Sequence, residues 1–120
     1  MSIYSKSSAL LGALGVALGA FGAHGLKQTL DLHQTAGIWQ TASQYHLLHS
    51  IALLSLSARS PIPKRAFLCF SIGILVFSGS LYALALTNIK TLGAITPVGG
   101  LLLISGWLLL LFQPRGHADT

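Results

Sequence analysis

Residues 66–86 read AFLCFSIGILVFSGSLYALAL, a long apolar run without a charged side chain. Its only ionisable side chains are those of Cys69 and Tyr82. A helix of this length reaches roughly 30 Å at about 1.5 Å per residue, which matches the hydrocarbon thickness of a bilayer. We therefore predict a transmembrane helix here.

Three further apolar runs cover residues 8–26, 41–58 and 92–112. Short connections between successive helices make them antiparallel neighbours. The sequence thus predicts an all-α fold: an integral membrane protein with one transmembrane domain over residues 1–120, built as an antiparallel up-and-down four-helix transmembrane bundle. Thr96 precedes Pro97, so we expect it to be the N-cap of a last helix shortened to about 16 residues.

Charged residues make up 8% of the chain, against roughly 25% in a globular protein, while 52% of the residues are hydrophobic. The acids are Asp31 and Asp119, so mechanisms that need paired carboxylates lack their groups. A net charge of +5 would suggest nucleic acid, but the basic residues lie at the ends of the apolar runs, as in membrane proteins. We expect no nucleic-acid partner.

The basic residues also predict the orientation, because cytoplasmic loops carry an excess of Lys and Arg. One side carries Lys6, Arg59, Lys64, Arg65 and Arg115, and the other carries Lys27 and Lys90. Both termini are expected to be cytoplasmic. The competing interpretation is a secretory signal peptide that starts around Lys6 and ends near Ala20 or Ala23, which would leave three spans.

Small residues and polar residues each gather on particular helix faces. Gly12, Gly15, Gly19 and Gly22 fall within an arc of roughly 80°, a pattern typical of close helix packing. A second group gathers at the non-cytoplasmic ends of the helices, and we expect it to form a hydrogen-bonded cluster or a small cup open to the outside. Its members are His24, Tyr45, His46, His49, Ser78, Tyr82 and Thr96.

Three chemical roles compete for this outer-leaflet cluster. His24, His46 and His49 could supply nitrogen ligands to zinc or copper, or His24 and His49 could bind a haem. The favoured interpretation is that the histidines hydrogen-bond to Ser78, Tyr82 and Thr96 and tie the helices together, with no metal or cofactor. Transport usually needs an ionisable group at mid-membrane depth, most often a carboxylate, and nucleophilic catalysis needs an acid to orient the histidine. The spans contain no carboxylate, so we expect no enzyme.

Several motifs resemble those of the YgdD-like family of small bacterial inner-membrane proteins, whose eukaryotic relatives are called transmembrane protein 256. They are GAFGAHGL at 19–26, Thr41 and Ala42 with Tyr45 and His49, FSGSLY at 77–82, ITPVGG at 95–100, and Gly106 with Trp107. The family motifs fall on His24, Tyr45, His49, Ser78, Ser80, Tyr82, Thr96 and Pro97. The family carries glutamine where this chain has His46, which weakens His46 as an essential ligand.

The resemblance implies four membrane-spanning helices, a multi-pass location in the bacterial inner (plasma) membrane, and no known reaction. We therefore expect a structural protein or an accessory subunit. Its partners would be membrane lipids and either further copies of itself or a larger membrane complex. The alternative is a small ligand, lipid, quinone or metal bound in the outer-leaflet cluster, or transport by an oligomer.

Overall fold

The computed structural model describes residues 2–113, and all regular secondary structure in this part of the chain is helical, with no strands. Arg115, which entered the charge count, lies outside the described residues. The all-helical class predicted from the sequence is confirmed. The elements are α1 (Ile3–Ala23), α2 (Lys27–His33), α3 (Ala36–Ser57), α4 (Lys64–Thr87), the short 3₁₀ helix η1 (Lys90–Ala94) and α5 (Thr96–Leu111).

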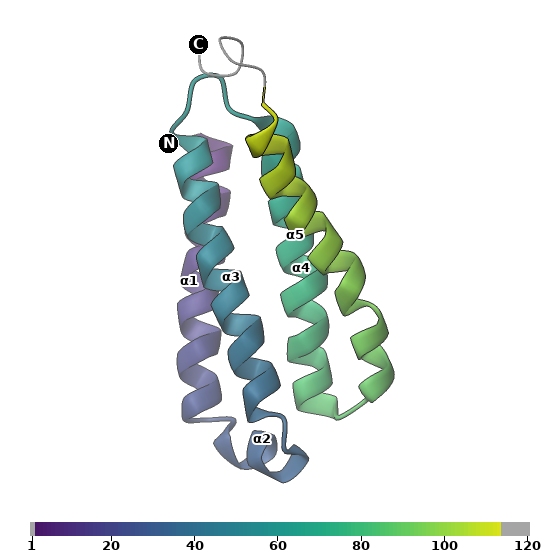
Figure 1. Ribbon diagram of the computed structural model, residues 1–120. Helices are drawn as coiled ribbons and strands as arrows, with labels where there is room; N and C mark the ends of the chain where they lie inside the picture. Colours follow the sequence, from purple (N-terminus) through teal and green to yellow (C-terminus); the bar gives the residue numbers. More distant parts are fainter. Residues whose placement is uncertain (1, 114–120) are drawn as a thin grey trace.

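The four long helices form a flattened row in the order α1, α3, α4, α5, and successive helices run in opposite directions (Figure 1). Within the described residues, the α-carbons of α1 come no closer than 8 Å to those of α4, and the same holds for α3 and α5. The overall extents of 52 × 28 × 17 Å reflect this flatness. The backbones of α1 and α5 therefore each approach one long neighbour closely, while side chains of all four long helices meet in the main apolar core, where Tyr4 of α1 packs against Phe67 of α4.

Glycines set the close spacing along the row. Gly12, Gly15, Gly19 and Gly22 of α1 all face α3, where a Cβ on Gly22 would collide with the indole of Trp39 and one on Gly15 with Leu47. Between α4 and α5, a Cβ on Gly99 would collide with the backbone of Phe77. The absence of side chains at these points lets the backbones approach and strengthens van der Waals packing.

The helix starting with Ala36 begins five residues earlier than predicted, and α2 was not predicted at all. The hydroxyl of Thr35 donates to the carbonyl oxygen of Ala85 at 2.7 Å, and Nδ1 of His33 lies 3.1 Å from the same oxygen. These contacts fasten the α2–α3 junction to the end of α4. They join residues about 50 positions apart, so local sequence patterns do not reveal them.

The last helix has the predicted length of 16 residues, but the predicted cap is wrong. Thr96 is already inside α5, and the N-cap is Ile95. The threonine hydroxyl lies 2.6 Å from Oγ of Ser80 on α4, so a contact between helices takes the place of the expected local cap.

Three helical segments among residues 2–113 are long and apolar enough to cross a membrane: Ile3–Ala23, Lys64–Thr87 and Lys90–Leu111. The sequence predicted four spans, and α3 is the one that does not meet this test. It has 22 residues, but it carries buried polar side chains, among them Ser43, His46, His49 and Ser50. These polar residues lower the mean hydropathy of α3. They are buried there because α3 lies between α1 and α4.

We predict that Gly99→Ala will lower the free energy of unfolding by about 1–3 kcal/mol, because backbone atoms of Phe77 occupy the space of the new methyl group. The measurement is an unfolding titration of the purified protein in mixed detergent micelles. Gly79→Ala is the matched control: no atom lies within 4 Å of its added Cβ, so its stability should stay unchanged or rise by at most about 1 kcal/mol. Equal losses for both variants would contradict the close α4–α5 approach.

Candidate functional site

His46 lies at the centre of the row and bonds to two other helices. It is the eleventh of the 22 residues of α3 and only 4% exposed. Its Nε2 lies 2.7 Å from the carbonyl oxygen of Leu11 on α1, and its Nδ1 lies 2.9 Å from the hydroxyl of Tyr82 on α4. A carbonyl oxygen only accepts, so Nε2 carries a proton. His46 therefore ties α1, α3 and α4 together.

Serines extend the contact between α3 and α4. The hydroxyl of Tyr82 lies 3.5 Å from Oγ of Ser43, and Ser78 donates to the carbonyl oxygen of Ala42 at 2.8 Å. Ser78 is 1% exposed. Each bond joins residues 36 or more positions apart, so the group holds together elements distant in sequence.

His49 forms a second buried centre, toward the end of α3 that leads to the 58–63 loop. Its Nδ1 lies 2.8 Å from the carbonyl oxygen of Tyr45, and its Nε2 accepts a hydrogen bond of 3.0 Å from Nε1 of Trp107. An indole nitrogen only donates and a carbonyl only accepts, so both ring nitrogens have defined roles and the imidazole is neutral. The Trp107 side chain thereby links α5 to α3 although their backbones do not touch.

Aromatic rings surround this second centre. Phe70 packs edge-on against His49 with ring centroids 5.3 Å apart, and Trp107 lies 4.9 Å from Phe70. Phe70 is completely buried and belongs to the main apolar core with Leu53 and Leu103. The His49 ring is therefore enclosed by apolar groups.

Thr96 and Ser80 form a third, separate contact between α4 and α5. Ser80 donates to the carbonyl oxygen of Phe77 at 2.9 Å, so the 2.6 Å contact between the two hydroxyls has Thr96 as its donor. Both hydroxyl groups therefore have a hydrogen-bond partner within the protein.

The structure separates His24 from the other candidate residues. His24 is the C-cap of α1 and is exposed, and the groove that it lines is formed by Leu14, Ala17, Leu18, Ala20 and Phe21 of α1 itself. Tyr45 is 43% exposed and stacks on His49 with ring planes 8° apart. The seven predicted residues thus form three hydrogen-bonded groups and one isolated histidine.

The structure bears on two expectations about this cluster. His46 and His49 were expected near the outer interface; because α3 starts at Ala36, His46 lies at mid-helix and His49 beyond it, and their depth in a membrane stays a prediction. A hydrogen-bonded cluster and a cup open to the outside were the two expected forms, and the two histidines, only 4% and 6% exposed, are hydrogen-bonded within the protein. A groove of about 410 Å³ near α2 lies between α1 and α3 and is lined by Trp39, Ser43 and Gln44 among others.

A three-histidine metal site is not formed by the described residues, where no group of three His, Cys, Asp or Glu side chains lies close enough to hold an ion. A metal on His46 or His49 would have to displace a hydrogen-bond partner, because every ring nitrogen of these two residues is engaged within the protein. His24 lies apart on the surface of α1.

Sequence patterns missed two residues that complete these contacts. Trp39 is 4% exposed and donates from Nε1 to the carbonyl oxygen of Leu18 at 2.8 Å, opposite Gly22. Ser43 lies beside Tyr82. Trp39 lies in the part of α3 that the predicted span, starting at residue 41, left out. The sequence did contain a clue to its packing: a large aromatic residue beside an apolar run, and a glycine face on the preceding helix that leaves room for it.

Comparison with known proteins identifies related chains. Residues 18–100 match the family described as protein of unknown function DUF423. A UPF0382 membrane protein of Staphylococcus aureus strain bovine RF122 is 41% identical over 116 residues, covering 92% of this chain and 93% of the relative. The UPF0382 membrane protein YwdK of Bacillus subtilis is 38% identical over 117 residues, covering 92% and 94%. No solved structure matches.

The predicted family resemblance is confirmed by these matches, because they identify small membrane proteins of unknown function. The relatives span nearly the same length as this chain, so the matches concern the chain almost in full.

We expect a double-mutant cycle between His49→Leu and Trp107→Phe to give a coupling energy of about 0.6 kcal/mol or more, since this is the average for hydrogen bonds between membrane helices. The measurement is the free energy of unfolding of the four proteins in mixed micelles. Ser78→Ala combined with Trp107→Phe is the control cycle; these residues share no hydrogen-bond partner, so their effects should add. A coupling of zero in the first cycle would refute the role of this bond.

Proposed function

The chain belongs to the DUF423 family of membrane proteins of unknown function, and on this basis we propose that it is a non-enzymatic structural protein or an accessory subunit of a membrane complex. One observation carries the proposal: the buried polar side chains at the centre of the helix row are engaged with one another or with the backbone. Groups used in this way stabilise helix contacts and leave no ring nitrogen of His46 or His49 free for a substrate or a metal.

The same observation argues against the ligand-binding alternative in the outer-leaflet cluster. Both buried histidines would have to break a bond to bind anything, and in hydrocarbon an abandoned donor or acceptor has no water to replace its partner. Carboxylates are also missing from the spans, so neither proton transfer nor general acid–base catalysis has its usual group.

For the membrane arrangement we propose four crossings, with α3 as the fourth. Its 22 residues reach roughly 33 Å at about 1.5 Å per residue, and four of its polar side chains, Ser43, His46, His49 and Ser50, are buried within the protein. The antiparallel row brings the start of α1 and the end of α5 to the same end of the molecule (Figure 1). Lys6, Lys64 and Arg65 lie at that end, which supports cytoplasmic termini in a bacterial inner membrane.

The outer surfaces of the row support contacts with lipid and with other protein subunits. Leu10 and Val16 of α1 are 62% and 61% exposed, and Leu101 and Ile104 of α5 are 65% and 55% exposed. Each terminal helix has only one long neighbour in the row. A second copy of this chain or a larger membrane complex would cover these faces, and nucleic acid has no part in this arrangement.

The orientation predicts that a reporter active only in the cytoplasm will be active when fused after Thr120, because four crossings return the chain to its starting side. A truncated fusion after Asp31, in α2, should be inactive as a matched control. Measuring both fusions in membrane fractions that contain the inserted protein distinguishes four crossings from three. Two inactive fusions would contradict the four-crossing arrangement, whereas an active Asp31 fusion with an inactive Thr120 fusion would contradict the cytoplasmic termini.

For the role as a structural or accessory subunit, we expect the protein solubilised gently from its native membrane to migrate as a complex. Native mass spectrometry should find either several copies of the chain or a second protein in constant ratio to it. The exposed faces of α1 and α5 are the reason for this expectation. Recovery of single copies alone, with the chain still folded, would overturn the accessory role.

A further inference from the structure

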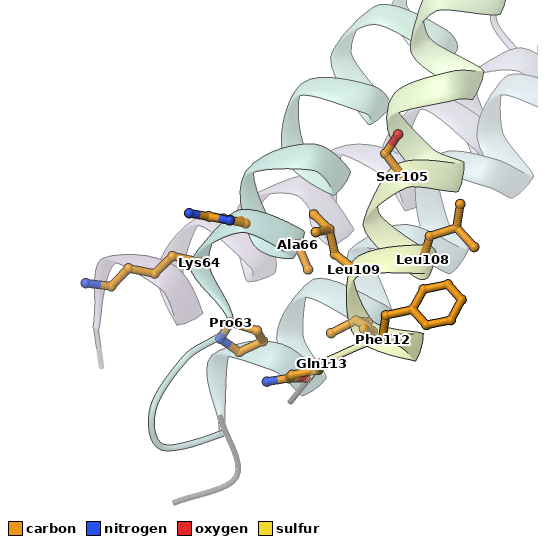
Figure 2. A pocket seen from close by; sticks show the side chains of 10 residues that line it. Pro63, Lys64, Ala66, Ser105, Leu108, Leu109, Phe112 and Gln113 are labelled. Carbon is orange, nitrogen blue, oxygen red and sulfur yellow. The ribbon is translucent and has the colours of Figure 1, made fainter. Parts of the chain in front are cut away.

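A groove of about 660 Å³ lies between the start of α4 and the end of α5. One wall is apolar and belongs to α5, with Leu108, Leu109 and Phe112 along it; the other is formed by Pro63, Lys64, Arg65 and Ala66 (Figure 2). The groove is open along its length. It is therefore accessible from the side, where a membrane protein meets lipid.

Its polar groups are concentrated at one end. Lys64 and Arg65 are exposed, and neither forms an ion pair with another described residue. Figure 2 shows the Lys64 side chain extending outward from the start of α4, away from α5. Flexible side chains of this kind keep their charge in the headgroup region while their stems lie along apolar surface.

Gln113 contributes a donor from the opposite side of the groove. Its Nε2 is buried, yet it has no hydrogen-bond partner among the described residues. A buried donor without a partner costs free energy, so a ligand with acceptor oxygens would be stabilised next to it. The first residues of α4 also have backbone N–H groups that no side chain caps, which favours negative charge at this end.

No described carboxylate competes for these cations. The acid within residues 2–113 is Asp31, which lies in α2 at the opposite end of the row and pairs with Lys27 at 3.0 Å. The groove thus combines an apolar wall with unpaired positive charge at its end. This is the complement of a molecule with hydrocarbon chains and an anionic head.

We propose that this groove binds one anionic phospholipid, with an acyl chain along the α5 wall and the phosphate beside Lys64, Arg65 and Gln113. The site is separate from the buried histidine contacts and goes beyond the structural role proposed above. It does not depend on the number of membrane crossings, because it needs only the described helix ends and a surrounding bilayer.

The test uses the full-length protein in a neutral detergent, titrated with phosphatidylglycerol or phosphatidylcholine and observed by native mass spectrometry. Each basic side chain near an anionic headgroup contributes about a fivefold factor in affinity. We expect the first phosphatidylglycerol to bind about 20-fold more tightly than the first phosphatidylcholine, and K64Q/R65Q to remove this preference.

The control variant K6Q/K90Q removes two exposed lysines elsewhere and should keep the preference. Ser105→Phe fills the groove without changing the charge, so it should weaken the binding of both lipids. Equal binding of the two lipids by the native protein would overturn the proposal, as would equal losses for K64Q/R65Q and K6Q/K90Q. Full displacement of phosphatidylglycerol by inorganic phosphate would also overturn it, since the groove would then be an anion site without a lipid chain.

Discussion

The buried polar side chains of α3 have to find their hydrogen-bond partners inside the protein, because α3 lies between α1 and α4 and these side chains have little contact with the surroundings. His46 and His49 meet this constraint in different directions. His46 bonds to α1 and α4, and His49 accepts from Trp107 on α5. The four long helices are thereby linked through one central helix, and any change in the register of α3 would break several of these bonds together.

Close backbone approach is the second condition for this arrangement. A bond of 2.7 Å from His46 to the carbonyl oxygen of Leu11 requires α1 to lie near α3, and the glycine face of α1 permits it. Small residues and buried polar groups therefore act together: the former bring the helices near and the latter hold their register. The glycines of α1 face α3, and Gly73 of α4 and Gly99 and Gly106 of α5 lie at the α4–α5 contact, so the helices approach closely in pairs.

Different parts of the molecule carry different kinds of side chain. Its middle is filled by hydrogen-bonded and aromatic side chains, whereas α1 and α5 expose large apolar faces. The groove at the end of α4 and α5 lies outside the middle and has a different character, with positive charge beside an apolar wall. The buried hydrogen bonds and the charged groove thus lie in separate parts of one small protein.

Local pattern by itself determined the helical class, the helix-packing glycines and the polar residue types, because apolar run length and the helical period are properties of short segments. Where α3 begins, and with it the position of His46 along that helix, follows only from contacts across the fold. Thr35 is held by Ala85 and Thr96 by Ser80, and no local signal specifies such distant partners. The division of the polar residues into separate groups likewise follows from which helices are neighbours, a choice made by side-chain fit across the whole row.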